Sequence, residues 1–190
     1  MGGINMSFPD VMIDLETLST EKNAVIIAIG AVVFDPYGND SFDKIEKDRM
    51  FYARLEFDSQ INMHRDISES TIRWWLSQSP EAQAEFAPGK TLAFPETAIV
   101  SLNNFIKQHR CGYAWGNGAT FDNVILQSLY QDYGIKWPVP YWGDMDLRTI
   151  KRFSEVDSLE WPDGVKHNAL DDAKQQVILA QHYVRNLGVK

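Results

Sequence analysis

Apolar and β-branched residues are concentrated in three runs near the beginning of the chain, and each run predicts a strand. Residues 8–15 (FPDVMIDL) and 23–34 (NAVIIAIGAVVF) are almost continuously apolar, which is typical of buried strands. Residues 50–57 alternate apolar and polar side chains, which indicates a half-exposed strand. Turn residues at 35–38 (DPYG) follow the second run. Together the three runs predict an antiparallel meander.

From residue 58 onwards the apolar positions recur at the spacing of helices. Helices are expected over residues 68–77, 95–109, 120–133, 144–153 and 168–187, with a short helix or turn over 80–86. Thr120 and Asn168 are the expected N-caps of the helices that they begin. A short strand is expected over residues 111–115, followed by a sharp turn at residues 117–118. Residues 154–166 contain Pro, Gly and several acids, and are expected to form a mobile loop.

This order of elements predicts an α/β fold in which helices flank a mixed central sheet. Three antiparallel strands come first, and helices, a further parallel strand and a closing helix follow, which together describe a three-layer sandwich. A chain of 190 residues is long enough to bury a sizeable core. We expect one domain over residues 1–190, with its core from about residue 8 to residue 188.

Composition excludes several classes of protein. The chain is 44% hydrophobic and 23% charged, as is usual for a soluble globular protein. No segment approaches the roughly 20 apolar residues needed to cross a bilayer, and residues 1–7 do not resemble a secretory signal. Cys111 is the only cysteine, so no internal disulfide can form and a cytoplasmic setting is expected.

The net charge of −8 argues against a protein that grips long duplex DNA through many phosphates. It leaves a short single strand open as a substrate, because few contacts hold it and bound divalent ions supply positive charge locally. The sequence leaves the oligomeric state open, a homodimer included.

Two acids at the end of the first strand are the first candidates for chemistry. Asp14 and Glu16 are two positions apart, so their side chains point to the same face of the strand. Such a pair is common on surface strands by chance. Here the preceding residues 11–13 (VMI) predict a buried strand, where two acids need a partner for their charge. Mg²⁺ or Mn²⁺ would be such a partner.

Two later segments place further acids at helix starts. Asp122 lies in residues 115–123 (WGNGATFDN), a strand, turn and helix start, where the helix dipole alone would also favour an acid. In the last helix, Asn168 as N-cap and Asp171 as the acid of a capping box leave Asp172 free to face the sheet. His167 lies just before this helix, five residues before Asp172.

These motifs, in this order, resemble those of the DEDDh exonucleases of the ribonuclease-H-like superfamily, which include polymerase proofreading subunits and oligoribonucleases. Their Asp-x-Glu-Thr motif is matched by residues 14–17 and is followed by a hairpin strand like residues 25–32. Their aromatic-Asp pair is matched by residues 121–122, and their His-x-Ala-x-x-Asp motif by residues 167–172. Within this family, residues 74–80 (WWLSQSP) and 115–118 (WGNG) resemble the exodeoxyribonuclease VIII and phage-type 3′→5′ exonuclease branch.

The resemblance implies a ribonuclease-H-like fold and a two-metal 3′→5′ exonuclease. Two divalent ions, Mg²⁺ or Mn²⁺, would bridge the scissile phosphate, with His167 as general base. The substrate would be the 3′ end of single-stranded nucleic acid, with DNA favoured by the branch, and the product a nucleoside monophosphate. The expected metal ligands are Asp14, Glu16, Asp122 and Asp172. The candidate substrate contacts are Leu15, Thr17, Leu18, Asn117 and, for stacking on a base, Trp74.

Three alternatives stay open at this point. One is a 3′→5′ exoribonuclease, because no motif states whether a 2′-hydroxyl is accepted. Another is a metal hydrolase acting on a small nucleotide or phosphodiester. The third is a catalytically silent ribonuclease-H-like scaffold. The chain retains all the acids and the histidine of the motifs, which argues against this alternative.

Overall fold

A mixed sheet forms the centre of the molecule. The computed structural model describes residues 9–87, 91–154, 156 and 164–188. In these residues five strands pair in the order β3-β2-β1-β4-β5. The strands are β1 (Asp10–Thr17), β2 (Ile26–Phe34), β3 (Met50–Arg54), β4 (Tyr113–Gly116) and β5 (Asp144–Asp146). The first three are antiparallel neighbours, whereas β4 is parallel to both β1 and β5. The predicted α/β class and mixed sheet are confirmed.

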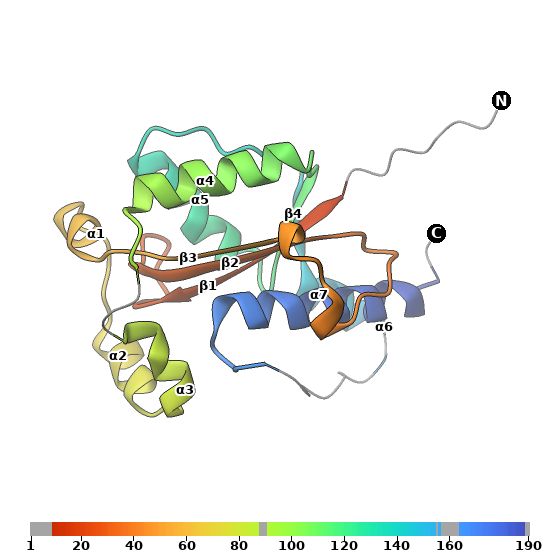
Figure 1. Ribbon diagram of the computed structural model, residues 1–190, viewed down its shortest axis with the longest axis horizontal. Helices are drawn as coiled ribbons and strands as arrows, with labels where there is room; N and C mark the ends of the chain where they lie inside the picture. Colours follow the sequence, from red (N-terminus) through yellow and green to blue (C-terminus); the bar gives the residue numbers. More distant parts are fainter. Residues whose placement is uncertain (1–8, 88–90, 155, 157–163, 189–190) are drawn as a thin grey trace.

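Helices cover both faces of this sheet. In Figure 1, α4 and α5 lie on one side of the sheet and α6 and α7 on the other, which gives three layers. A smaller group of helices, α1 to α3, lies beside the end of the sheet. The helices are α1 (Asp58–Asn62), α2 (Glu69–Leu76), α3 (Pro80–Gln83), α4 (Pro95–Gln108), α5 (Asp122–Asp132), α6 (Leu147–Ser154) and α7 (Ala169–Asn186), with 3₁₀ turns η1 (Phe42–Lys44), η2 (Lys47–Arg49) and η3 (Ala84–Phe86). None of the described helices is long and apolar enough to cross a membrane.

Alternation along β1 divides the core between the two helical layers. Val11, Ile13 and Leu15 belong to the core that α4 and α5 complete. Met12 belongs instead to the core that α7 completes. Because side chains two apart share a face, Asp14 and Glu16 point to the α7 side. All eight residues of β1 are buried, so the side chains of both acids are largely removed from water.

The structure corrects the prediction of a helix over residues 144–153. Its first three residues form β5, which pairs with β4, and the helix begins only at Leu147. A three-residue strand of sequence Asp-Met-Asp is too short to show a period, and aspartate is disfavoured in strands, so its conformation comes from pairing with its neighbour. The predicted loop over residues 154–166 lies mostly outside the described residues.

Thr120 was expected to cap α5, and this prediction is wrong. The helix begins at Asp122, its N-cap position is Phe121, and no side chain caps it. The Gly118 carbonyl oxygen accepts from the backbone N–H groups of both Phe121 and Asp122, at 2.7 and 3.3 Å. A turn carbonyl therefore sets the start of the helix, two residues later than the sequence indicated.

Candidate active site

A cavity of about 610 Å³ opens at the carboxyl ends of β1 and β4, the edge where open α/β sheets usually bind ligands. We call it the acidic cleft, because each of the four predicted metal ligands lines it. Its lining residues are Asp14, Leu15, Glu16, Thr17, Thr20, Ser70, Thr71, Trp74, Trp75, Asn117, Phe121, Asp122, Arg148, Lys166, His167, Asp172 and Gln176. Side chains as far apart in the chain as Asp14 and Gln176, which are separated by 162 positions, thus meet in one place.

Close packing of α7 on β2 brings Asp172 to the acids of β1. Gly30 is the partner of Asp14 in the β1–β2 register. A Cβ at Gly30 would lie 2.1 Å from the carbonyl oxygen of Ala169, so only glycine lets the start of α7 approach this closely. One turn after Asp172, the Gln176 side-chain amide donates a 2.6 Å hydrogen bond to Asp14. The predicted N-cap of this helix is confirmed, since the Asn168 side chain accepts from the Asp171 N–H at 3.1 Å.

Asp122 enters the cleft from the other helical layer. It is 3% exposed, and its Oδ1 accepts a 3.2 Å hydrogen bond from the Leu15 N–H. A Cβ at Gly116 would lie 3.0 Å from Oδ2 of Asp122, so the absence of a side chain there admits the carboxylate. The first turn of α5 is thereby tied directly to β1, between its two acids.

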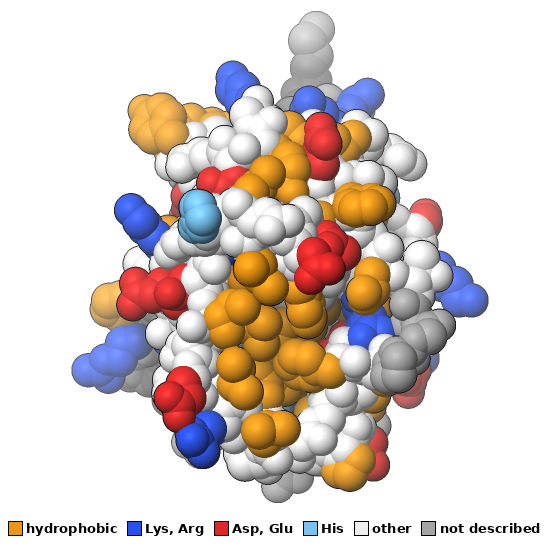
Figure 2. Space-filling view, turned by 90° about the vertical axis from the view of Figure 1, so that its left-hand side faces the viewer, with side chains coloured by type: hydrophobic (Ala, Val, Ile, Leu, Met, Phe, Trp, Pro, Cys, Tyr) orange, Lys and Arg blue, Asp and Glu red, His pale blue; other side chains and the backbone are white. Residues whose placement is uncertain are grey.

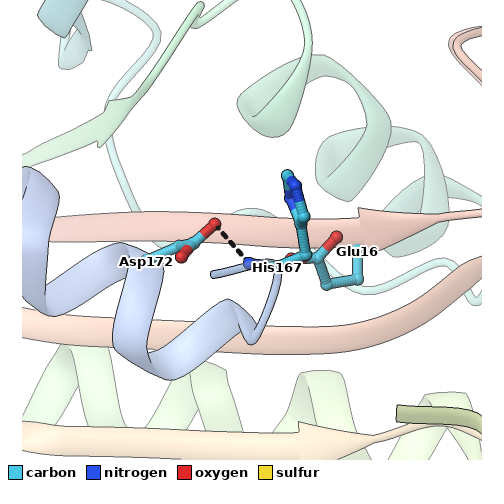
Figure 3. A group of neighbouring side chains, drawn as sticks. All are labelled: Glu16, His167 and Asp172. Atoms are coloured by element: carbon cyan, nitrogen blue, oxygen red, sulfur yellow. Dashed lines mark hydrogen bonds between the residues drawn. The ribbon is translucent and has the colours of Figure 1, made fainter. Parts of the chain in front are cut away.

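His167 lies beside the acids in a constrained backbone conformation. Its φ is 66°, in the left-handed region, and its N–H donates to Oδ2 of Asp172 at 3.2 Å. The imidazole packs edge-on against Trp74, with ring centroids 4.8 Å apart. Glu16, His167 and Asp172 each place one ligand atom within 4.8 Å of the others. Figure 3 shows these three side chains, with Glu16 on β1 and Asp172 at the start of α7.

Burial raises the pKa of every acid in the cleft. It raises the pKa of Glu16 to about 9, and the charges of Asp172, Glu85 and Asp122 add to the effect. Burial also raises the pKa values of Asp122 and Asp172 to about 7. The pKa of Asp14 rises well above its ordinary range, from burial first and then from its acidic neighbours.

The pKa of His167 is lowered, mainly by burial and also by Lys166, so the imidazole stays neutral near pH 7. A neutral imidazole has a free lone pair with which to accept a proton. The cleft therefore combines acids that resist ionisation with a histidine that resists protonation.

The residues of the cleft fit a divalent cation. The donor set is rich in carboxylate oxygen, as Mg²⁺ and Mn²⁺ prefer. Among the described residues, Oδ1 of Asp172 is buried without a hydrogen-bond partner, although buried carboxylate oxygens ordinarily have one. A cation would satisfy this oxygen and supply the countercharge that the buried carboxylates lack.

The predicted substrate contacts fall in two places. Leu15, Thr17, Trp74 and Asn117 line the acidic cleft. Leu18 lines a separate, apolar hollow of about 310 Å³ beside it, together with Ile72, Trp75, Leu76, Gln83 and Phe86. Figure 2 shows hydrophobic side chains gathered on the face that carries α2 and α3. Trp75 lines both cavities and separates them.

Sequence reasoning missed Arg148 and Gln176 as residues of the cleft. The guanidinium of Arg148 lies over the turn before α5, within 3.2 Å of where a Cβ on Gly118 would be. In the part of the chain that the structure describes, this guanidinium has no hydrogen bond or ion pair, although its charge lowers the pKa of Asp122. No spacing in the sequence relates Arg148 to the motifs. It lies in the first turn of α6, directly after β5, and the pairing of β5 with β4 brings that turn to the cleft. Lys166 is a second basic residue that lines the cleft, whereas Arg73 pairs with Glu69 on the surface at 2.8 Å.

Known proteins resemble this chain in sequence and in fold. The model of the family described as "3′-5′ exoribonuclease Rv2179c-like domain" matches residues 9–184. The exodeoxyribonuclease of Enterobacteria phage T4 is 26% identical over an alignment 204 positions long, which covers 93% of this chain and 89% of the phage protein. Among solved structures, the Mg²⁺- and Mn²⁺-bound form of S. pombe Pop2p is similar in fold, with a TM-score of 0.53 and 13% identity. That match covers 92% of this chain and 82% of the other. The fold is the ribonuclease-H-like α/β sandwich that the motifs implied.

Proposed function

The chain belongs to the 3′-5′ exoribonuclease Rv2179c-like family, and on that premise we propose that it is a metal-dependent 3′→5′ exonuclease of the DEDDh type. It releases nucleoside monophosphates from the 3′ end of single-stranded nucleic acid. The observation that carries the proposal is the gathering of Asp14, Glu16, Asp122 and Asp172, all buried, around one cleft. So many desolvated carboxylates need cations, and phosphodiester hydrolysis uses cations held in this way.

These four acids would hold two divalent ions, Mg²⁺ or Mn²⁺. When bound, such ions supply positive charge at the scissile phosphate and at its leaving 3′ oxygen. Gln176 keeps Asp14 oriented through its 2.6 Å hydrogen bond, and the Leu15 N–H does the same for Asp122 at 3.2 Å. Orientation of ligands by such neighbours matters for metal affinity.

His167 takes the proton of the attacking water at an imidazole nitrogen. Its lowered pKa keeps that nitrogen unprotonated at neutral pH, which a general base requires. The new bond forms between the water oxygen and phosphorus, and the bond from phosphorus to the 3′ oxygen of the preceding nucleotide breaks. The products are a nucleoside 5′-monophosphate and a strand shortened by one nucleotide with a free 3′ hydroxyl.

The rim of the cleft supplies the substrate contacts. Arg148 is a cation without a protein partner in the described residues, so it is available to a phosphate oxygen. Trp74 is 43% exposed and offers a ring face to the terminal base. Thr17 and Asn117 also line the cleft, and they are polar contacts for the sugar and backbone.

DNA is the polymer that we favour, because the phage relative, similar along almost the whole chain, is an exodeoxyribonuclease. The second candidate is an exoribonuclease, which the family description favours. The deciding experiment degrades 5′-labelled single-stranded DNA and RNA of one sequence side by side, with Mg²⁺, with Mn²⁺ and with chelator. Stepwise shortening that chelator abolishes is expected, and faster on DNA. Folded protein that shortens neither strand in either metal would overturn the exonuclease proposal, and cleavage of dinucleotides alone would point to a small-substrate hydrolase.

A further inference from the structure

A buried acid lies just outside the acidic cleft, and so far it has entered only through its effect on the pKa of Glu16. Glu85, in the 3₁₀ turn η3, is 2% exposed. Its Oε2 accepts from the Tyr52 hydroxyl at 2.5 Å and lies 3.6 Å from Nε of the buried Arg54. Its Oε1 accepts from the side-chain amide of Asn168. Glu85 therefore connects the β3 edge of the sheet to the residue that follows His167.

Asn168 uses both ends of its amide. Its Oδ1 accepts from the Asp171 N–H at 3.1 Å and so caps α7, while its Nδ2 donates to Glu85. Because both carboxyl oxygens of Glu85 accept hydrogen bonds, Glu85 fixes which end of the amide faces the helix. A side chain with a single oxygen, such as serine, would be sufficient for the cap alone.

The turn that Glu85 holds is a costly one. His167 has a φ of 66°, and a non-glycine residue in the left-handed region costs about 1–3 kcal/mol. Such a conformation persists only where contacts with the surrounding residues hold it. The contacts that hold this backbone conformation come from two sides. Asp172 accepts from the His167 N–H at 3.2 Å, and Asn168, the next residue, is held by Glu85.

The segment that carries Glu85 also holds the imidazole ring. We call residues 69–86, which comprise α2, α3 and η3, the aromatic segment. Its Trp74 and Trp75 pack edge-on against His167 at centroid distances of 4.8 and 6.2 Å. Trp75 packs in turn against Phe86 at 5.1 Å, directly beside Glu85. The same segment therefore contacts both the ring and the backbone turn of the histidine.

We propose that Glu85 is a positioning residue for the reaction, which sets the position of His167 through Asn168. The proposal rests on the proposed function, in which His167 accepts the proton of water. Loss of the link should leave metal ligands and substrate contacts in place, while the imidazole loses its fixed orientation. It should therefore lower kcat and leave KM nearly unchanged, because orientation affects the chemical step.

The decisive variants break the link while keeping the helix cap. Asn168→Ser retains a capping oxygen and does not reach Glu85. Asn168→Asp retains the cap and sets a carboxylate against a carboxylate. Glu85→Gln alone keeps an acceptor for Asn168 but removes the charge that faces the buried Arg54 guanidinium, so its melting temperature should fall, and its kcat is the reference for the double variant. We expect both Asn168 variants to lose about 10–100-fold in kcat, the loss usual for residues that orient a reactive group.

The double variant Glu85→Gln/Asn168→Asp reverses the hydrogen bond, since the new amide at position 85 donates and the new carboxylate at position 168 accepts. It should recover most of the kcat that Asn168→Asp loses, which a merely structural role for either residue does not predict. All rates are taken at saturating Mg²⁺, with thermal melts to compare folding and calorimetry to show that Mg²⁺ uptake is unchanged.

His167→Ala is measured in the same series and separates the two proposals. If His167→Ala is as fast as the unmodified protein, the role of His167 in the proposed function is wrong. If His167→Ala is slow but folded Asn168→Ser keeps full kcat, the role of Glu85 is overturned and that of His167 stands. If the double variant folds, binds Mg²⁺ and stays as slow as Asn168→Asp, the coupling between Glu85 and Asn168 is likewise overturned.

Discussion

Two of the walls of the acidic cleft differ in construction. One wall is β1 with the first turn of α7, where Asp14, Glu16 and Asp172 are buried and belong to central elements of the fold. The other wall is the aromatic segment, in which Trp75 is the one buried residue of α2 and Trp74 and Leu76 face solvent.

This difference indicates which part of the cleft suits metal binding and which suits contacts with bases. Rigid, buried elements fix atoms closely, as metal ligands require, and their desolvated carboxylates need a cation to balance the charge when they ionise. An exposed segment with aromatic faces can meet bases of any identity, because every base has a π-face. Substitutions of the acids in the first wall should therefore abolish the reaction, and substitutions of the exposed aromatic residues in the second should weaken substrate binding.

The largest expected effect contrasts Asp172→Asn with Asp171→Asn. Asp172 lines the cleft, whereas Asp171 lies one residue before it, accepting from the Val165 N–H at 2.9 Å. Removing a metal ligand forfeits several kcal/mol of transition-state stabilisation, so Asp172→Asn should lower kcat by about 1,000-fold or more. Asp171→Asn should lose about 10-fold at most, since it weakens only a turn. Equal losses in two folded proteins would mean that the first wall has a different ligand.

Arg148→Ala tests whether the guanidinium at the rim of the cleft binds a phosphate of the substrate or only stabilises the fold. A charge-assisted hydrogen bond to phosphate is worth about 1.5–3 kcal/mol, so KM for a labelled single strand should rise about 10–100-fold. Arg152→Ala is the matched control, because Arg152 is exposed on the same helix and does not line the cleft. A KM that both variants leave unchanged would remove Arg148 from the substrate contacts.

Trp74→Ala should have a smaller effect, confined to substrates that carry a terminal base. Stacking contributes about 1–3 kcal/mol per base, and partial stacking at the rim should raise KM about 5–10-fold. Leu76→Ala is the control on the same helix, since Leu76 is 72% exposed and lies outside the cleft. A substrate with an abasic 3′ residue should not distinguish Trp74→Ala from the unmodified protein. If it does, Trp74 acts through His167 and not through the base.

The smallest expected effect is a dependence of stability on pH and Mg²⁺. The folded pKa values of Asp122 and Asp172, about 7, exceed their ordinary value of 3.8, so between these values the folded state holds more protons than the unfolded chain. In chelator, the free energy of unfolding should therefore fall as pH rises from about 4 to 7, and Glu16 extends the fall to about 9.

Mg²⁺ replaces those protons, so its stabilising effect should grow over the same pH window. Melting temperatures with and without Mg²⁺ should differ by several degrees at the alkaline end and converge near pH 4. A difference that is constant with pH would show that the ion binds away from these carboxylates.

Local spacing was sufficient to predict several parts of this molecule. Alternation along β1 placed Asp14 and Glu16 on one face, and Asn168 was identified as the N-cap of α7 from its side chain and its neighbours. Both features depend on residues within one turn or two strand positions, so the sequence alone determines them. The order of strands and helices likewise predicted the sandwich.

Other features were decided by tertiary structure, because they depend on pairs distant in the chain. The strand β5 forms through its pairing with β4, and this pairing brings Arg148, at the start of α6, to the cleft. The close approach of Ala169 to Gly30 brings the start of α7 to the acids of β1. Glu85 accepts a hydrogen bond from Asn168, which lies 83 positions further along the chain. No local pattern encodes such contacts, since they form only when packing of the two helical layers on the sheet fixes the distance between segments.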